Sequence, residues 1–358
     1  MLRLIFSTRA WLAVLPIALS LGCGSSDAPQ HDGGTVGPAL SVLAGIPGRQ
    51  GVVDGTGMLC PFSGPDSMVS DGAGNLYVTD YSRVRTIAIG TGTVTTLAGH
   101  PASMSADGTG LDAAFFGAHG IAYDGQGNLY VTDIQTIRKV VIATAEVTTL
   151  VGTPGVYGTA DGTGASAAFT ELEGIALDGQ GNLFVTDVYG RNIRRVEIAT
   201  GTVTTLAGSG AIVSVDGVGT AASFYAPFGM TYDGAGNLYL FDNGTIRKVV
   251  IATGTVTTLV GSPTTGSADG VGASAGLGSQ GDLKSDGNGT LYVADTENGA
   301  IRKVVIATRT VETLVGVLEQ HALMLGPLPG GLVTPQALAV DAAGALYVSD
   351  DFAILVVR

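Results

Sequence analysis

The chain has 358 residues, with 17 basic and 30 acidic side chains and a formal net charge of −13. This balance argues against nucleic-acid binding, because phosphate contacts require clustered Lys and Arg. It equally argues against adhesion to anionic lipid by charge. After the N-terminal segment, no apolar run approaches the length of a membrane span.

Residues 1–22 are predicted to be a signal peptide. Arg3 and Arg9 precede a largely apolar stretch over residues 10–19. That stretch is too short to cross a membrane and lies where the apolar core of a secretory signal is expected. The sequence therefore predicts an exported protein.

Cys23 closes the sequence Leu-Ser-Leu-Gly-Cys, which resembles a bacterial lipobox. The resemblance implies cleavage before Cys23 and acylation of its thiol, and Gly24 in the next position implies sorting to the outer membrane. The alternative is a plain signal peptide with an incidental cysteine. Residues 23–38 are rich in Gly, Ser, Asp and Pro and are predicted to be a flexible tether.

A five-residue motif of the type Leu-Tyr-Val-Thr-Asp recurs at intervals of 53 to 55 residues. Its six copies begin at Leu76, Leu129, Leu183, Leu238, Leu291 and Leu346. A fixed period of this size indicates a repeat architecture, in which each unit buries its apolar faces against its copies.

Each repeat contains four short apolar runs separated by turn residues. In the second copy these runs cover residues 120–123, 129–131, 137–142 and 147–151. Their β-branched residues and the Gly, Asp and Asn between them are typical of strands and tight hairpins. Six four-stranded antiparallel units predict an all-β fold, a six-bladed β-propeller.

The two ends of the chain are predicted to share one blade. The chain stops after the third strand of the sixth copy, which leaves that copy without a fourth strand. Residues 39–45 precede the first copy and end in the Leu-Ala-Gly of the other fourth strands. We therefore expect residues near 40–44 to pair with residues near 353–357, so that residues 39–358 close a ring without an open edge.

The repeats resemble NHL repeats. The resemblance is carried by residues 174–178 and 187–208, and it spans roughly residues 40–358. It implies a propeller used as a binding platform, since NHL propellers serve many unrelated roles. Residues 281–284 and 354–357 depart from the repeat pattern.

Several residue types recur in five or in all six repeats and are predicted to be structural. A bulky apolar residue that we expect in the core recurs as Phe62, Phe115, Phe169, Phe224, Leu277 and Leu332. An Asp that ends the second strand recurs as Asp80, Asp133, Asp187, Asp242, Asp295 and Asp350. An Arg in the third strand recurs as Arg85, Arg138, Arg194, Arg247 and Arg302. We expect the Asp and Arg side chains to form hydrogen bonds and ion pairs.

An Asp-Gly-x-Gly loop also recurs, beginning at Asp54, Asp107, Asp161, Asp216 and Asp269. Its spacing resembles parts of calcium or phosphate loops, but the further ligands of those loops are missing. We expect a tight turn capped by the Asp side chain, with a surface calcium as the alternative.

One position of the inner strand varies between repeats. Five residues before the Asp that ends each inner strand, the copies carry Asp66, His119, Glu173, Phe228, Gly281 and Gln336. Asp282 lies beside this position in the fifth copy. Because the innermost strand of a propeller lines the central channel, we expect Asp66, His119, Glu173, Phe228, Asp282 and Gln336 to form a ring at the channel mouth, on the face that carries the Asp-Gly loops.

Three interpretations of this ring stay open. Asp66, His119 and Glu173 resemble the metal ligands of related lactonase and lyase propellers, which implies a metal-dependent hydrolase or lyase. With four histidines in the chain, a carboxylate-rich calcium site is a better expectation than a multi-histidine zinc site. The third interpretation is an ordinary polar, water-filled channel mouth.

We expect a binding or interaction module rather than an enzyme. No Gly-x-Ser-x-Gly nucleophile elbow is evident, because the match to this pattern at residues 272–276 lies in an Asp-Gly loop of an all-β repeat and not between a strand and a helix. The sequence requires no cofactor, calcium being the expected ion if one binds. The expected partner is a protein, peptide or glycan of the bacterial envelope, and the expected state is a monomer held to the outer membrane by its lipid alone.

Overall fold

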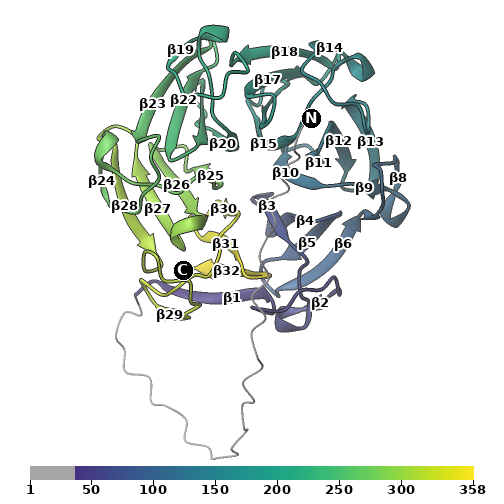
Figure 1. Cartoon of the computed structure of the whole chain (residues 1–358). Coiled ribbons are helices and arrows are strands. Elements are labelled where there is room, and N and C mark those ends of the chain that lie inside the picture. Colours follow the sequence, from purple (N-terminus) through teal and green to yellow (C-terminus); the bar gives the residue numbers. More distant parts are fainter. Residues whose placement is uncertain (1–36) are drawn as a thin grey trace, which may run out of the picture. The chain divides into compact units, whose positions relative to one another are not determined.

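The computed structural model describes residues 37–358, so the predictions for the signal peptide and for Cys23 lie outside the described residues. The described chain forms six antiparallel sheets arranged as a ring of blades (Figure 1). Among these residues, no helix is long and apolar enough to span a membrane. The prediction of a six-bladed propeller is confirmed.

Each blade runs from an inner strand at the channel to a two-residue strand at the outer edge. In this order, blade 1 contains β3 (Pro65–Ser70), β4 (Asn75–Asp80), β5 (Arg83–Ala88), β6 (Thr93–Ala98) and β2 (Gly55–Thr56). Blade 2 contains β10 (Ala118–Tyr123), β11 (Asn128–Asp133), β12 (Thr136–Val141), β13 (Glu146–Gly152) and β8 (Gly108–Thr109). Blade 3 contains β15 (Leu172–Leu177), β16 (Asn182–Asp187), β17 (Asn192–Glu197), β18 (Thr202–Ala207) and β14 (Gly162–Thr163).

The remaining blades follow the same order. Blade 4 contains β20 (Pro227–Tyr232), β21 (Asn237–Asp242), β22 (Thr245–Val250), β23 (Thr255–Gly261) and β19 (Gly217–Val218). Blade 5 contains β25 (Leu283–Ser285), β26 (Thr290–Asp295), β27 (Ala300–Val305), β28 (Thr310–Val315) and β24 (Gly270–Val271). Blade 6 contains β30 (Leu338–Val340), β31 (Leu346–Asp350), β32 (Ala353–Val357), β1 (Ala39–Gly45) and β29 (Gly326–Pro327). A further small sheet pairs β7 (His100–Pro101) with β9 (Ala114–Phe115).

The ring closes as the sequence predicts. β1 pairs antiparallel with β32, with Leu40 opposite Val357 and Gly45 opposite Ala353 (Figure 1). The first described strand therefore completes the last blade, and the backbone groups of β32 are not left at an open edge.

The core lies between neighbouring blades, because the second strands are buried on both faces. In β4, Leu76 and Val78 pack toward blade 6, whereas Tyr77 packs toward blade 2. Alternate residues of a strand point to opposite faces, so a continuous apolar run serves two interfaces at once. Phe115 belongs to the same cluster as Tyr77 and is fully buried, as expected for the repeated bulky residue.

The repeated Asp and Arg residues form a buried ion network in blades 1 to 5. In blade 1 the Arg85 guanidinium lies 3.0 Å from Asp80 and 3.0 Å from Asp54, over the ring of Phe62. Asp80 also accepts hydrogen bonds from the backbone N–H groups of Ser63 and Gly64. The structural interpretation of these residues is confirmed. Blade 6 has Leu355 in the place of the Arg.

The Asp-Gly loops differ from expectation in two respects. Asp54 does not cap its own turn; its carboxylate accepts hydrogen bonds from Arg85 of β5 and Thr96 of β6. The following residues form β2, which pairs with Thr93 and Val94 at the beginning of the fourth strand. In an antiparallel blade the first and fourth strands run in opposite directions, so the fourth strand begins at the end of the blade that is far from the beginning of the inner strand. The loops therefore lie at the outer edge of the blade and not around the channel mouth.

Candidate functional site

Three of the predicted mouth residues occupy matching positions on consecutive blades. Asp66, His119 and Glu173 are each the second residue of an inner strand, in β3, β10 and β15. Phe228 holds the same position in β20. The inner strands surround the centre of the ring (Figure 1).

A β-bulge directs each of these side chains. The pairing register between inner and second strand shifts around His119 between Ala118 and Ile121, and around Glu173 between Leu172 and Ile175. A bulge of this kind bends the strand and re-aims the side chain within it. The side chain at the mouth therefore does not follow the alternating pattern that buries the neighbouring side chains of the strand.

Glycine allows neighbouring inner strands to approach closely at this level. A Cβ on Gly120, the residue after His119, would overlap the carbonyl oxygen of Glu173. A Cβ on Gly174 would come within 2.6 Å of the Phe228 oxygen. The absence of a side chain at both positions brings blades 2, 3 and 4 together where the site residues lie.

Hydroxyl groups of the second strands hold the backbone of the site. Thr79 in blade 1 donates to the His119 oxygen at 2.6 Å, and Thr132 in blade 2 donates to the Glu173 oxygen at 2.8 Å. Ser349 in blade 6 donates to the oxygen of Pro65, immediately before Asp66, at 2.9 Å. Each hydroxyl also accepts a backbone N–H of its own blade, so it ties two blades together at a site residue.

Asp66, His119 and Glu173 form one contact cluster, which we call the mouth triad. His119 Nδ1 lies 2.6 Å from Asp66 Oδ2 and 3.4 Å from Glu173 Oε2. Their side chains are 37%, 23% and 22% exposed for Asp66, His119 and Glu173, respectively. The triad is therefore reachable from solvent yet partly dehydrated, which strengthens its internal electrostatics.

The charges of the triad shift its proton affinities. Burial disfavours a charge on His119, but the Glu173 charge and the Asp66 hydrogen bond outweigh it and raise the pKa of His119 to about 10. Burial raises the pKa of Glu173 to about 8, against the opposing effect of the His119 charge. At neutral pH the imidazole is therefore protonated and lies between two carboxyl groups.

The other predicted mouth residues do not join the triad. Phe228 packs against the apolar cluster between blades 4 and 5. Asp282 forms an ion pair with Lys284 at 3.2 Å and accepts the Leu338 N–H of blade 6. Gln336 precedes β30, and its backbone N–H bonds to Ser349. β25 and β30 begin later than the other inner strands, and three of the six predicted residues form the contact cluster.

Two residues near the triad were not foreseen. Burial raises the pKa of Glu171 and the His119 charge opposes this rise, so the charges of Glu171 and His119 interact. The pKa of the exposed Tyr189 is raised chiefly by the charge of Glu171, and less by burial and by the charge of Glu173. Glu171 lies two residues before Glu173, and alternate residues of a strand point to the same face. This spacing in the sequence could have indicated Glu171 as a neighbour of the triad.

The mouth triad could hold a cation. One ligand atom from each of Asp66, His119 and Glu173 can be chosen such that all three lie within 4.8 Å of one another. One imidazole nitrogen with two carboxylates suits Zn²⁺ or Mn²⁺ better than Ca²⁺, which takes oxygen ligands. Such an ion would first have to displace the proton of His119.

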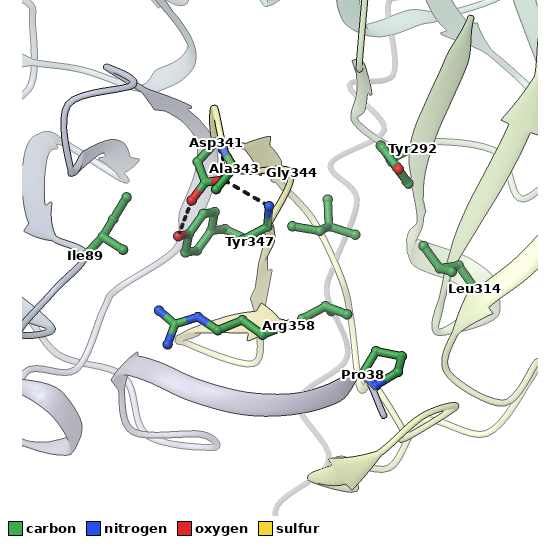
Figure 2. A pocket seen from close by; sticks show the side chains of 12 residues that line it. Pro38, Ile89, Tyr292, Leu314, Asp341, Ala343, Gly344, Tyr347 and Arg358 are labelled. Atoms are coloured by element: carbon green, nitrogen blue, oxygen red, sulfur yellow. Dashed lines mark hydrogen bonds between the residues drawn. The ribbon is translucent and has the colours of Figure 1, made fainter. Parts of the chain in front are cut away.

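A cavity of about 550 Å³ opens at the other end of blade 6 (Figure 2). There the Tyr347 hydroxyl donates to Asp341 at 2.8 Å. In blade 1 the residue that corresponds to Asp341 is Asp71, which accepts a hydrogen bond from the Asn75 side chain. Blade 6 has the shorter Ala345 at the position of Asn75. The lining of the cavity contains none of the mouth residues.

Comparison with known proteins identifies the repeats. No protein-family model matches the chain. It is 34% identical over 183 residues to NHL repeat-containing protein 2 of Bos taurus, which covers 46% of this chain and 25% of that protein. It is 31% identical over 150 residues to the Arabidopsis thaliana protein SUPPRESSOR OF QUENCHING 1, chloroplastic, which covers 39% of this chain and 14% of that protein. The chain thus spans a quarter or less of these relatives.

Solved structures share the fold at low sequence identity. An auxiliary nutrient binding protein from Bacteroides thetaiotaomicron matches with a TM-score of 0.70 and 14% identity, over 90% of this chain and 77% of that one. A protein of unknown function from the same organism matches with a TM-score of 0.69 and 19% identity, over 90% and 76%. A gluconolactonase from Xanthomonas campestris matches with a TM-score of 0.57 and 14% identity, over 91% and 99%. Together with the blade structure, these relationships show that the chain carries repeats similar to NHL repeats and folds as a six-bladed β-propeller.

Proposed function

We propose that this protein is a binding module that takes its partner at the channel mouth. The observation that carries the proposal is the convergence of Asp66, His119 and Glu173 from three blades, each aimed by a bulge and held by a hydroxyl of a neighbouring blade. The Asp and Arg residues that repeat in blades 1 to 5 bind one another in the ion networks. The triad differs from blade to blade and faces solvent, which is the property of a recognition site.

The protonation of the triad favours binding over catalysis. A His119 pKa of about 10 lies about three units above neutral pH. Freeing its nitrogen for a metal or for proton abstraction would then cost about 4 kcal/mol. Propellers of this fold include both binding proteins and enzymes, so the fold itself does not choose between them.

A metal-dependent hydrolase or lyase is the second candidate. It is supported by the 4.8 Å grouping of one imidazole and two carboxylates. Elemental mass spectrometry of the purified protein, with thermal melts before and after EDTA, separates the candidates. The binding module predicts no stoichiometric metal and an unchanged melt. Metal lost in Glu173→Gln and kept in the exposed control Glu312→Gln would instead support the enzyme.

Photo-crosslinking tests the binding role directly. Phe228 holds in β20 the position that the triad residues hold in their inner strands, so a p-benzoyl-phenylalanine there places a crosslinker on the blade next to the triad. One at the exposed Val271 in β24 serves as control. The proposal predicts a discrete adduct from position 228 in intact cells, which disappears in Glu173→Gln. Equal adducts from both positions, or an adduct indifferent to Glu173, would contradict it.

We further propose that the propeller is displayed on the bacterial envelope by a lipid on Cys23, with the outer membrane as its location. The tether of residues 23–38 would separate the propeller from the bilayer. Cys23→Ser is expected to abolish incorporation of a labelled fatty acid and to release the protein from the membrane fraction. Retention of the label in this variant would contradict the proposal.

A further inference from the structure

The exposed aromatic side chains of the described residues all lie in two kinds of link, which connect one blade to the next or the second strand to the third. They form the set that we call the aromatic rim, namely Tyr81, Phe116, Tyr157, Tyr189 and Tyr225. Their exposed fractions range from 44% to 65%. Both kinds of link adjoin the ends at which the inner strands begin, which is the end of the blades that carries the mouth triad.

Backbone hydrogen bonds tie the rim to the triad. Ala118, immediately before His119, donates its N–H to the oxygen of Tyr81. Val188, immediately before Tyr189, donates to the oxygen of Glu171. The rings of Tyr81 and Tyr189 therefore extend from backbone that adjoins the strands carrying His119 and Glu173.

The rim is confined to one side of the ring. Phe116 and Tyr225 follow the repeated core residues of blades 2 and 4, whereas Gly278 and Val333 occupy that position in blades 5 and 6. Thr296 and Asp351 stand where blade 1 has Tyr81. Aromatic rings and the mouth triad thus share blades 1 to 4, so a surface that recognises a partner is concentrated there.

The carboxyl groups of this surface outnumber its cations. Asp66 and Glu173 contact the imidazolium of His119, and the charge of Glu171 interacts with it. Glu173, with a pKa of about 8, is largely protonated at neutral pH and ionises when a further cation approaches. In the links that carry the rim, the basic residues are His100 and Arg191, and the Arg191 guanidinium donates to the oxygen of Tyr225. Aromatic faces and carboxylates both attract cations, and an arginine or lysine stem packs well on an aromatic ring.

We propose that the mouth triad and the aromatic rim together bind a protein segment that presents a lysine or arginine side chain to Asp66 and Glu173. Apolar residues flanking the basic side chain lie on the rim. A protein segment is favoured over a small amine because the rim extends over links of four blades. This inference rests on the proposed binding function and specifies the chemistry of its partner.

Selection of random displayed peptides on the full-length protein tests the inference. The expected result is enrichment of peptides with Lys or Arg beside apolar residues, and replacement of that residue by Gln should weaken binding about tenfold or more. Glu173→Gln and Tyr81→Asn should weaken it similarly. Tyr81 has a positive φ of 59°, and Asn tolerates this conformation, as Asn243 does at the same position of blade 4.

The controls and contrary outcomes separate the two proposals. Glu312→Gln and Val271→Ser remove an exposed acid and an exposed apolar side chain away from the mouth, and should leave affinity unchanged. Enriched peptides without a basic residue would overturn the cationic partner but retain the binding module. Binding of a glycan array through the rim would do the same. If peptides and glycans both fail to bind and Phe228 crosslinks nothing, both proposals fall.

Discussion

The hydroxyl of Thr79 in blade 1 donates a hydrogen bond to the carbonyl oxygen of His119 in blade 2, with 2.6 Å between the two oxygens. It simultaneously accepts the N–H of Ser67 on its own inner strand at 3.0 Å. One side chain therefore joins two inner strands at the residue whose imidazole lies in the mouth triad.

Replacing Thr79 by Val should loosen this junction. The change keeps the shape of the side chain but leaves the Ser67 N–H without its acceptor and the His119 carbonyl without this donor, at a cost of about 1–3 kcal/mol. Urea unfolding measures the loss. Thr79→Ser keeps the hydroxyl and should retain most of the stability; an equal loss in both variants would show that the hydrogen bond contributes nothing.

The blade ion network should be sensitive to loss of its Arg. Arg138→Leu leaves the buried carboxylate of Asp133 without its counterion and is expected to destabilise the protein by about 3–5 kcal/mol. Thermal or urea unfolding provides the measurement. The next residue, Lys139, forms no ion pair among the described residues, so Lys139→Leu is the matched control and should cost much less. Comparable losses would refute a specific role of the network.

Asp350 should make stability depend on pH. Burial, opposed by hydrogen bonds from Val333 and Thr334, raises its pKa from 3.8 to about 6. Because the folded pKa exceeds the unfolded one, the protonated form favours folding, and stability falls as pH rises from about 4 through about 6.

Asp350→Asn keeps an oxygen acceptor for the two N–H groups. A shift of roughly two units corresponds to about 3 kcal/mol, so this variant should gain up to that amount at pH 8 and little at pH 4. Melting temperatures recorded across this pH range test it. A gain independent of pH would contradict the assignment to Asp350 ionisation.

The His119 imidazolium should persist well above neutral pH. Its pKa of about 10 in the folded protein exceeds the ordinary value of 6.5. The stability that this charge contributes is therefore fully present below about pH 6.5 and is lost as the pH rises through about 10. Asp66→Asn removes one carboxylate and should lower this pKa. NMR titration of the ring proton on Cε1 measures it; an unchanged midpoint in Asp66→Asn would show that the hydrogen bond does not hold the proton.

Much of the fold follows from local pattern. The period of the Leu-Tyr-Val-Thr-Asp motif determines six units, and the missing fourth strand of the last copy determines closure by β1, because an exposed strand edge requires a partner. Position 119 stands out in the sequence because a repeat makes any departure from its neighbours visible. The ion pairs of Asp80 and Arg85 were likewise foreseeable, since they recur together.

Other features required the tertiary structure. The sequence by itself determined strands, blade number, ring closure and the candidate positions at the mouth, because these follow from periodicity and turn chemistry. Tertiary structure alone decided that Asp66, His119 and Glu173 meet while Asp282 pairs with Lys284, because this depends on bulges and on how closely neighbouring inner strands approach. It also decided that Asp54 binds Arg85 and that Ala118 bonds to the backbone of Tyr81, since these contacts join segments brought together within a blade and between neighbouring blades.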